Sequence, residues 1–425
     1  MRSLSWRETF SVYSNPKVIA MIFLGFSGGL PFLLVFSTLS AWLAEGDVSR
    51  TTIGFFAWIG TTYSIKVLWA PVVDSIPVLF LTRHLGQRRS WMLLGQLGIA
   101  FGLLLMAHTG PSGLLILSLS AFVVAFSSAT QDIAIDAYRI ESAPLYHQGA
   151  MSAAYVFGYR LALLVSGAGA LYLAEYFSWH VSYMVMSSLM LVGVITVVLL
   201  SEPNREIAGT LPEFSRAGIS QWLNHSVLGP FVDFFSRNGK NAFIILLFIS
   251  VFRLSDIAMG IMANPFYLDM GYTKSEIASV AKVFGFFMSI AGSFICGVFV
   301  VKWGLMRPLL IGAIAVAGTN LLFASLSMLD PKISFLAIVI SGDNLAGGFA
   351  ATAFIAYLSS LTNKTYTATQ YALFSSLMTL PGKFLSGFSG LVVDRLGYFE
   401  FFIFAAILGL PSILLVIWLT HHEEK

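Results

Sequence analysis

The chain has 425 residues, of which 57% are apolar and only 11% are charged. Soluble globular domains carry about 25% charged residues, so this composition excludes that class and indicates a protein that folds in a lipid bilayer. The formal net charge of +3 gives no reason to expect nucleic acid as a partner, and a single cysteine excludes a disulfide framework within the chain.

Twelve apolar runs are long enough to cross roughly 30 Å of hydrocarbon as helices. Six lie near 18–43, 52–73, 91–109, 113–138, 150–174 and 180–200, and six lie near 242–268, 275–300, 307–328, 333–358, 366–392 and 399–419. Lipid offers no partners to backbone groups, and the alternation of a barrel strand is absent. We therefore expect an all-α membrane protein with twelve transmembrane helices in two six-helix pseudo-repeats.

A more polar interval divides the two sets of runs near the middle of the chain. We expect residues 1–200 to form an N-terminal bundle, 201–241 a linker, and 242–425 a C-terminal bundle. Apolar residues recur in the linker at spacings of one, three and four, which predicts short amphipathic helices on the membrane surface. These residues are Ile219, Trp222, Leu223, Val227, Phe231, Phe234 and Phe235.

The basic residues indicate how the runs are oriented. If the N-terminus is cytoplasmic, fifteen of the 24 lysines and arginines fall in inner segments, five lie within runs, and only Arg50, Lys274, Lys332 and Arg395 fall outside. This bias predicts that both termini of a multi-pass protein are cytoplasmic.

Polar and charged residues also occur where lipid should exclude them. A charge at the bilayer centre costs about 2.5 to 3.5 kcal/mol, so such residues are expected to face a cavity or a partner. Within or close to the runs lie Lys66, Gln131, Asp132, Asp136, Arg160, Arg253, Asp256, Lys282, Asp343 and Lys383. We expect these residues, apart from Asp136 and Asp256, to border a path for a small polar substrate.

The fourth run carries the densest group. Asp132 and Asp136 are four residues apart and share one helix face, and Arg139 and Glu141 follow toward the inner mouth. We predict that Asp136, Arg139 and Glu141, together with Asp74 at the inner end of the second run, form a cytoplasmic gate or its ion pairs. For the deeper Asp132, a structural and a functional role are both open.

Arg160 offers Asp132 a partner. Asp132 lies 13 residues before residue 145 and Arg160 lies 15 residues after it, so both reach a similar depth on consecutive antiparallel helices. The interaction could be a buried ion pair or a pair opened by protonation or an anionic substrate. Arg253, Asp256 and Lys282 form a comparable group across the seventh and eighth runs.

No chemistry beyond transport is indicated. The sequence has no Walker loop, no metal-ligand spacing and no nucleophile motif, so we expect neither an enzyme nor a cofactor. The seven histidines lie in loops or tails or, like His108 and His180, at the ends of runs, so proton coupling would have to use carboxylates, for which Asp132 and Asp256 are the candidates.

An internal repeat relates the two halves. Ser166-Gly167 followed by Leu171 recurs 220 residues later as Ser386-Gly387 followed by Leu391. The connection Gly86-Gln87-Arg88-Arg89 also has a glycine-containing and basic counterpart at Gly304 and Arg307. These features resemble the major facilitator superfamily, in which two six-helix halves enclose a site near the midplane.

A narrower resemblance is to the AmpG family of muropeptide permeases. It is carried by Gly25-Phe26-Ser27-Gly28-Gly29-Leu30-Pro31, Ser128-Ala129-Thr130-Gln131-Asp132-Ile133, Gly158-Tyr159-Arg160-Leu161, Asp343-Asn344-Leu345-Ala346-Gly347-Gly348 and Ala368-Thr369-Gln370-Tyr371-Ala372-Leu373. By position, the resemblance makes Gly29, Gln131, Asp132 and Arg160 candidates for the path, and Asn344 is a further candidate. At Asp343 the family pattern would have glutamate.

The resemblance implies proton-driven import of anhydro-muropeptides across the bacterial inner membrane, for peptidoglycan recycling, by alternating access and as a monomer. Siderophore uptake by a permease of the same wider family is the alternative, and a facilitator without ion coupling is a third possibility.

Overall fold

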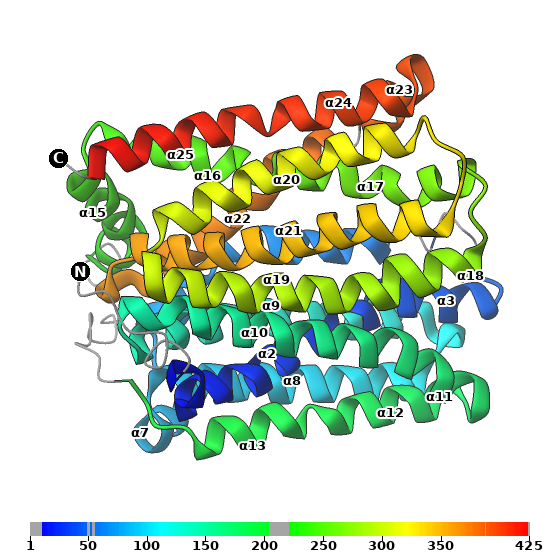
Figure 1. Ribbon diagram of the computed structural model, residues 1–425. Coiled ribbons are helices and arrows are strands. Elements are labelled where there is room, and N and C mark those ends of the chain that lie inside the picture. The colour runs from blue at the N-terminus through cyan, green and yellow to red at the C-terminus, as the bar shows by residue number, and fades with distance from the viewer. Residues whose placement is uncertain (1–10, 49–51, 53–55, 204–220, 387, 424–425) are drawn as a thin grey trace.

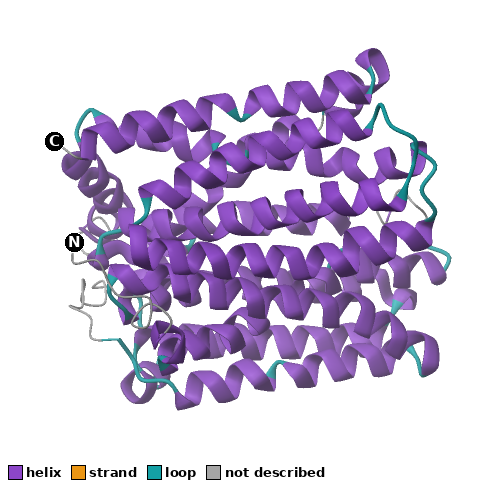
Figure 2. Ribbon diagram, viewed as in Figure 1, coloured by secondary structure: helices purple, strands orange, loops and turns teal. Residues whose placement is uncertain are grey.

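The computed structural model describes residues 11–48, 52, 56–203, 221–386 and 388–423. Every regular element in this part of the chain is a helix, and the long helices lie side by side along one direction (Figures 1 and 2). Both chain ends lie at the same end of the bundle, which we call the termini end; the opposite one is the far end. The expected all-α fold is confirmed.

The N-terminal half comprises the helices before residue 204. They are η1 Val12–Ser14, α2 Pro16–Leu34, α3 Ser37–Glu45, η2 Ala57–Gly60, α5 Thr61–Ser64, η3 Lys66–Leu68, α6 Ala70–Ser75, α7 Leu81–Leu85, α8 Gln87–Thr109, η4 Pro111–Gly113, α9 Leu114–Ser142, η5 Leu145–His147, α10 Gln148–Leu164, η6 Val165–Gly169, α11 Ala170–Tyr176, α12 Trp179–Leu189 and α13 Leu191–Leu199.

The C-terminal half follows two surface helices, η7 Leu223–Leu228 and α15 Gly229–Asn238. Its helices are α16 Asn241–Val251, α17 Leu254–Asp269, α18 Lys274–Ile277, η8 Ala278–Phe284, α19 Gly285–Trp303, α20 Met306–Leu326, α21 Ile333–Leu361, η9 Lys364–Tyr366, α22 Thr367–Ser386, α23 Ser389–Leu396, α24 Tyr398–Leu408 and α25 Leu410–Glu423.

Ten helical segments within the described ranges are long and apolar enough to cross a membrane, and each coincides with one of the predicted runs. The other two runs are the second and the eleventh. The second run is divided into the short helices from η2 to α6, and the eleventh is the more polar α22 followed by α23. Both contribute side chains to the contact between the halves, as described below, so an uninterrupted apolar surface is not required of them.

The outer faces of the bundle are apolar. Leu115, Leu119 and Phe122 of α9 are exposed, as are Phe243 and Leu247 of α16. In water, such continuous apolar surface would be an aggregation site, whereas in a bilayer these side chains face acyl chains.

Glycines bring α2 and α10 into backbone contact. A Cβ at Gly158 would lie 1.8 Å from the carbonyl oxygen of Ile22, and a Cβ at Gly25 would lie 2.1 Å from that of Tyr155. Only a residue without a side chain fits at either position. Small residues of this kind allow close helix packing in membranes, where no hydrophobic driving force acts between helices.

We predict that Gly158→Ala lowers the melting temperature of the detergent-solubilised protein, because the added methyl group meets backbone rather than a movable side chain. The expected loss is about 1–3 kcal/mol or more. Gly318→Ala on α20 is the matched control, since a Cβ there meets nothing within 4 Å, and it should be neutral or stabilising by up to about 1 kcal/mol. Equal melting temperatures for both variants would contradict the close contact.

The surface helices η7 and α15 lie at the termini end and contact both halves (Figure 1). Trp222 Nε1 donates to Ser75 Oγ of the N-terminal half at 2.9 Å. Asp233 accepts from the side-chain amides of Asn363 and Gln370 in the C-terminal half, at 2.9 and 2.8 Å. Burial alone would raise the pKa of Asp233, but hydrogen bonds, led by those of the two amides, outweigh it and lower that pKa. Much of the predicted linker, including Ile219, lies outside the described residues.

Candidate functional site

A charged cluster joins the two halves at the termini end. Arg88 of α8 is fully buried and pairs with Asp74 of α6 at 2.7 Å and with Glu141 of α9 at 2.6 Å. The other carboxylate oxygen of Asp74 accepts from both the backbone N–H and the hydroxyl of Thr369, each at 3.1 Å. A carboxylate at the start of a helix accepts hydrogen bonds from the free N–H groups there and is attracted to the positive end of the helix dipole. Asp74 therefore links the N-terminal half to the first turn of α22.

Glu202 fixes the helix that carries Arg88. Its carboxylate accepts from the backbone N–H of Arg88 at 2.7 Å and of Arg89 at 3.2 Å. Gly86, with φ +87°, allows this approach, because a Cβ there would lie 2.3 Å from Glu202 Cγ. Burial raises the pKa of Glu202, although the two backbone donors oppose that shift.

Arg139 makes a second connection between the halves. Its guanidinium is fully buried, pairs with Asp136 at 3.2 Å, and donates from Nη1 to Ser359 Oγ of α21 at 2.7 Å and to Ser152 Oγ of α10 at 3.3 Å. It also lies 5.2 Å from the ring centroid of Tyr371 on α22. One side chain of the N-terminal half therefore contacts two helices of the C-terminal half.

A close backbone contact between α10 and α19 completes this closure. A Cβ at Gly297 would lie 3.1 Å from the carbonyl oxygen of Gly149 and 2.2 Å from the hydroxyl of Tyr13. Tyr13 in turn donates to the carbonyl oxygen of Phe294 at 3.3 Å. Together with the contacts of Asp74 and Arg139, this seam leaves the halves in direct contact at the termini end.

Asp132 lies deeper in the N-terminal half, beside the glycines of α2. A Cβ at Gly28 would lie 3.2 Å from Asp132 Oδ1 and 3.0 Å from the hydroxyl of Tyr155. Asp132 Oδ1 is buried and has no hydrogen-bond partner among the residues that the structure describes. The charges that act on this carboxylate are those of Lys66 and Asp136, which lie 4.0 Å apart.

The neighbouring candidates on α2 and α9 have packing contacts as well. Gln131 Oε1 accepts from Ser27 Oγ at 2.9 Å, whereas its buried Nε2 has no partner within the described ranges. A Cβ at Gly29 would lie 2.6 Å from the carbonyl oxygen of Tyr159. The structure thus gives Gly29 a role in the contact between α2 and α10.

Within the described residues, Asp132 and Arg160 do not form the closed ion pair considered above. Equal depth brings the two side chains together only if α9 and α10, which are consecutive in the chain, pack face to face. Instead α10 packs mainly along α2 and, across the interface, along α19. Arg160 interacts electrostatically with Arg253 and Asp256 of the C-terminal half.

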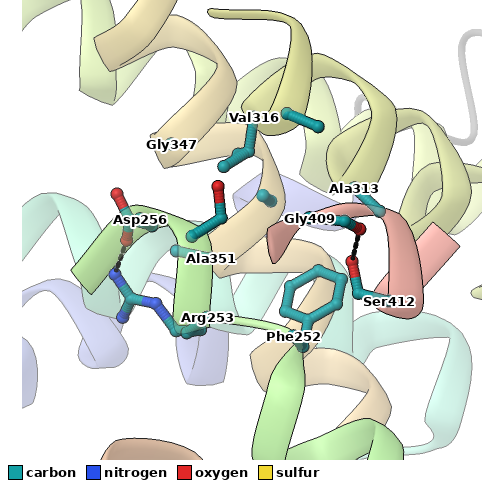
Figure 3. Close-up of a pocket in the computed structure, with 12 residues that line it drawn as sticks. Phe252, Arg253, Asp256, Ala313, Val316, Gly347, Ala351, Gly409 and Ser412 are labelled. Carbon is teal, nitrogen blue, oxygen red and sulfur yellow. Dashed lines mark hydrogen bonds and ion pairs between the residues drawn. The ribbon is translucent and has the colours of Figure 1, made fainter. Parts of the chain in front are cut away.

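The C-terminal half contains its own charged pair. Arg253, at the break between α16 and α17, forms an ion pair with Asp256, and both line a pocket of about 350 Å³, counting the space open to solvent. Figure 3 shows this pair on one side of the pocket and Phe252, Gly409 and Ser412 on the other. All residues that line the pocket belong to the C-terminal half, so it is not a space between the halves.

The remaining path candidates lie on three other helices. Asp343 Oδ1 accepts from Thr319 Oγ1 at 3.5 Å, and Asn344 donates to the carbonyl oxygen of Ile340 at 3.2 Å. Lys383 of α22 donates to Ser64 Oγ of α5 at 2.6 Å, which is another contact across the halves. Lys282 belongs to η8, and its side chain lies outside the described residues.

Comparison with known proteins gives this arrangement a family. The profile of the Major Facilitator Superfamily matches residues 18–385. The chain is 35% identical to "Putative transporter AmpG 4" of Rickettsia conorii, over 96% of this chain and 97% of that protein. It is 32% identical to the "Anhydromuropeptide permease" of Escherichia coli K12, over 96% of this chain and 80% of that protein. The chain belongs to the AmpG family of the Major Facilitator Superfamily.

Solved structures agree with the fold of this AmpG-family chain. The E. coli fucose:proton symporter FucP has a TM-score of 0.70 at 11% identity, covering 98% of this chain and 99% of that one. The proton:xylose symporter XylE has a TM-score of 0.65 at 12% identity, covering 97% and 95%. These likenesses agree with the fold, and the family identifies a transporter rather than an enzyme.

Several partners of the charged residues at the contact between the halves were not among the predicted site residues. They are Ser359, Thr369, Tyr371 and Ser64. Thr369 and Tyr371 belong to the segment 368–373, which carries part of the family resemblance, so the sequence did mark this segment as a candidate. Ser359 and Ser64 are small polar residues of a kind that occurs throughout the chain, so nothing in the sequence distinguishes them.

We predict that Arg139→Gln destabilises the protein strongly, because it leaves Asp136 buried without its nearest cation. The expected loss is about 3–5 kcal/mol, measured as a fall in melting temperature in detergent. Arg237→Gln removes a comparable pair with Asp233 in which the arginine side chain is 38% exposed, so it should cost less than about 1 kcal/mol. A loss for Arg139→Gln no larger than that control would refute the bridging role of Arg139.

Proposed function

We propose that this AmpG-family transporter imports anhydro-muropeptides across the bacterial inner membrane, driven by protons. The similarity that supports this substrate is to the permease of Escherichia coli, which covers 96% of this chain at 32% identity. The mechanism is supported by the charged cluster at the termini end, in which the buried side chains of Arg139 and Asp74 in one half contact helices of the other. Contacts of this kind can be exchanged when the halves move against each other.

We further propose that the termini end faces the cytoplasm and that this conformation opens outward. The excess of lysine and arginine in segments on that side supports the orientation. Asp74, Asp136, Arg139 and Glu141 then act as the cytoplasmic gate, closed here by the contacts of Asp74 with Thr369 and of Arg139 with Ser359. Opening the gate requires these contacts to break while the far end closes.

Asp132 is the better of the two proposed proton carriers. One of its oxygens is buried without a partner in the described structure, and Lys66 lies near enough to influence its charge. Asp256, by contrast, is already held in an ion pair with Arg253. A carboxylate whose oxygen lacks a hydrogen-bond partner and lies near a cation can take up and release a proton when the site opens to one side of the membrane and then to the other. It can do so because no single ion pair fixes its charge.

The substrate proposal is tested by uptake into right-side-out membrane vesicles that contain the protein. Labelled N-acetylglucosaminyl-anhydro-N-acetylmuramyl tripeptide should accumulate when a pH gradient, acid outside, is imposed, and should not accumulate in vesicles without the protein. A ferric siderophore chelate is the competing probe. Uptake of the chelate without uptake of the muropeptide would overturn the proposal in favour of the alternative substrate.

The coupling proposal is tested by Asp132→Asn, which removes the titratable group but keeps its shape. We expect accumulation driven by the pH gradient to fall by at least about tenfold, a change of roughly 1.4 kcal/mol, while equilibrium exchange of the substrate persists. Asp394→Asn is the matched control, since Asp394 is an exposed carboxylate on α23. If Asp132→Asn kept full gradient-driven accumulation, Asp132 would not carry the proton.

A further inference from the structure

Arg160 is an arginine in the middle of the bundle whose donors have no assigned acceptor in the described part of the chain. Across the ranges that the structure describes, its guanidinium is assigned neither a hydrogen bond nor an ion pair, and the residue is half-buried. A guanidinium carries five N–H donors in a planar fork and stays charged. Leaving it unpaired at this depth is costly, which favours binding of an anion that supplies the missing acceptors.

Arg160 and Arg253 lie at the same level from opposite halves. Arg160 is twelve residues from Gln148, where α10 begins, and Arg253 is twelve residues from Asn241, where α16 begins. Both helices start at the termini end, so at 1.5 Å per residue each arginine lies roughly 18 Å into the bundle. Their electrostatic interaction agrees with this placement.

The neighbouring carboxylate does not neutralise Arg160. Asp256 interacts with Arg160 electrostatically, but its ion pair is with Arg253, which lies three residues before it at the start of α17. Asp343 interacts with Asp256 and accepts a hydrogen bond from Thr319 rather than from either arginine. Two guanidinium groups and one carboxylate that is already paired thus act on one another across the interface, and no acceptor for the fork of Arg160 is found among the described residues.

We infer that Arg160 binds a free carboxylate of the transported molecule, with Arg253 placed to share it from the other half. Planar carboxylates accept two parallel hydrogen bonds from a guanidinium, which lysine cannot reproduce. A carboxylate bound between the arginines would contact both halves at once, so cargo binding and closure of the halves would be linked. This inference rests on the proposed function for the identity of the cargo and adds the chemical group that is recognised.

The test compares the free acid of the anhydro-muropeptide tripeptide with the same molecule whose carboxyl groups are all amidated. Binding to the full-length purified protein is measured by ligand-induced shift of the melting temperature, and transport by uptake into vesicles. We expect the wild type to prefer the acid by about ten- to hundredfold, the range given by one charge-assisted hydrogen-bonded pair.

Variants at Arg160 test whether this residue causes the preference for the acid over the amide. Arg160→Gln should lower affinity for the acid to the level of the amide and leave amide binding unchanged, and Arg160→Lys should restore only part of the preference. Arg395→Gln is the matched control, since Arg395 is an exposed arginine on α23, and it should keep the full preference. Equal loss for acid and amide in Arg160→Gln, or a preserved preference, would overturn the inference.

Failure of the proposed function is distinguished by a second probe. If the wild type binds neither form of the muropeptide, that function fails, and the carboxylate site is then tested with N-acetylmuramic acid against its amide in the same assay. A preference for the acid that disappears in Arg160→Gln would retain the site. No preference would overturn the inference as well.

Discussion

The buried guanidinium of Arg139 is the interaction on which the observed arrangement of the two halves depends. It pairs with Asp136 within its own helix, yet its remaining donors reach Ser152 of α10 and Ser359 of the opposite half. A buried ion pair contributes little net stability, because desolvation offsets the attraction, but losing one partner is costly. Such a group therefore acts less as a source of stability than as a constraint on which arrangements of the helices are allowed.

Charges are tolerated within the bundle where protein groups compensate them. At the termini end each buried arginine has carboxylates or hydroxyls within hydrogen-bond distance, so its charge is compensated inside the protein. Deeper in, one oxygen of Asp132 and the guanidinium of Arg160 have no hydrogen-bond partner among the residues that the structure describes. We propose that the paired charges at the termini end hold the halves together. The charges without partners deeper in the bundle are available to a proton or a substrate.

Apolar run length was sufficient to predict the helices, because the bilayer imposes both the length and the pairing of backbone groups. The all-α fold, the family and the major facilitator architecture are confirmed. The second run shows the limit of this approach: its residues are apolar, but the helix is divided between Ala57 and Ser75. The domain boundaries and the site residues stay predictions.

Partners of the predicted charges could not be derived from depth alone. Depth along a helix is a one-dimensional quantity, whereas a contact also depends on which helices are neighbours and on how each is rotated. Asp132 and Arg160 match in depth, yet α10 packs along α2 and α19, and Arg160 meets charges of the other half instead. Glycine positions such as Gly25 and Gly158 decide that packing, and their role is visible only once the facing backbone is known.

The most direct test of an alternating gate at the termini end is a reversible cross-link across it. Ser152 and Ser359 accept from the same nitrogen of Arg139, at 3.3 and 2.7 Å, and come from opposite halves. In a Cys296→Ala background, which removes the single native cysteine, the pair Ser152→Cys and Ser359→Cys is oxidised in vesicles and uptake is measured. We predict that the disulfide forms, stops uptake, and releases it again on reduction. Undiminished uptake by the fully cross-linked protein would show that the halves need not separate here and would contradict the gate.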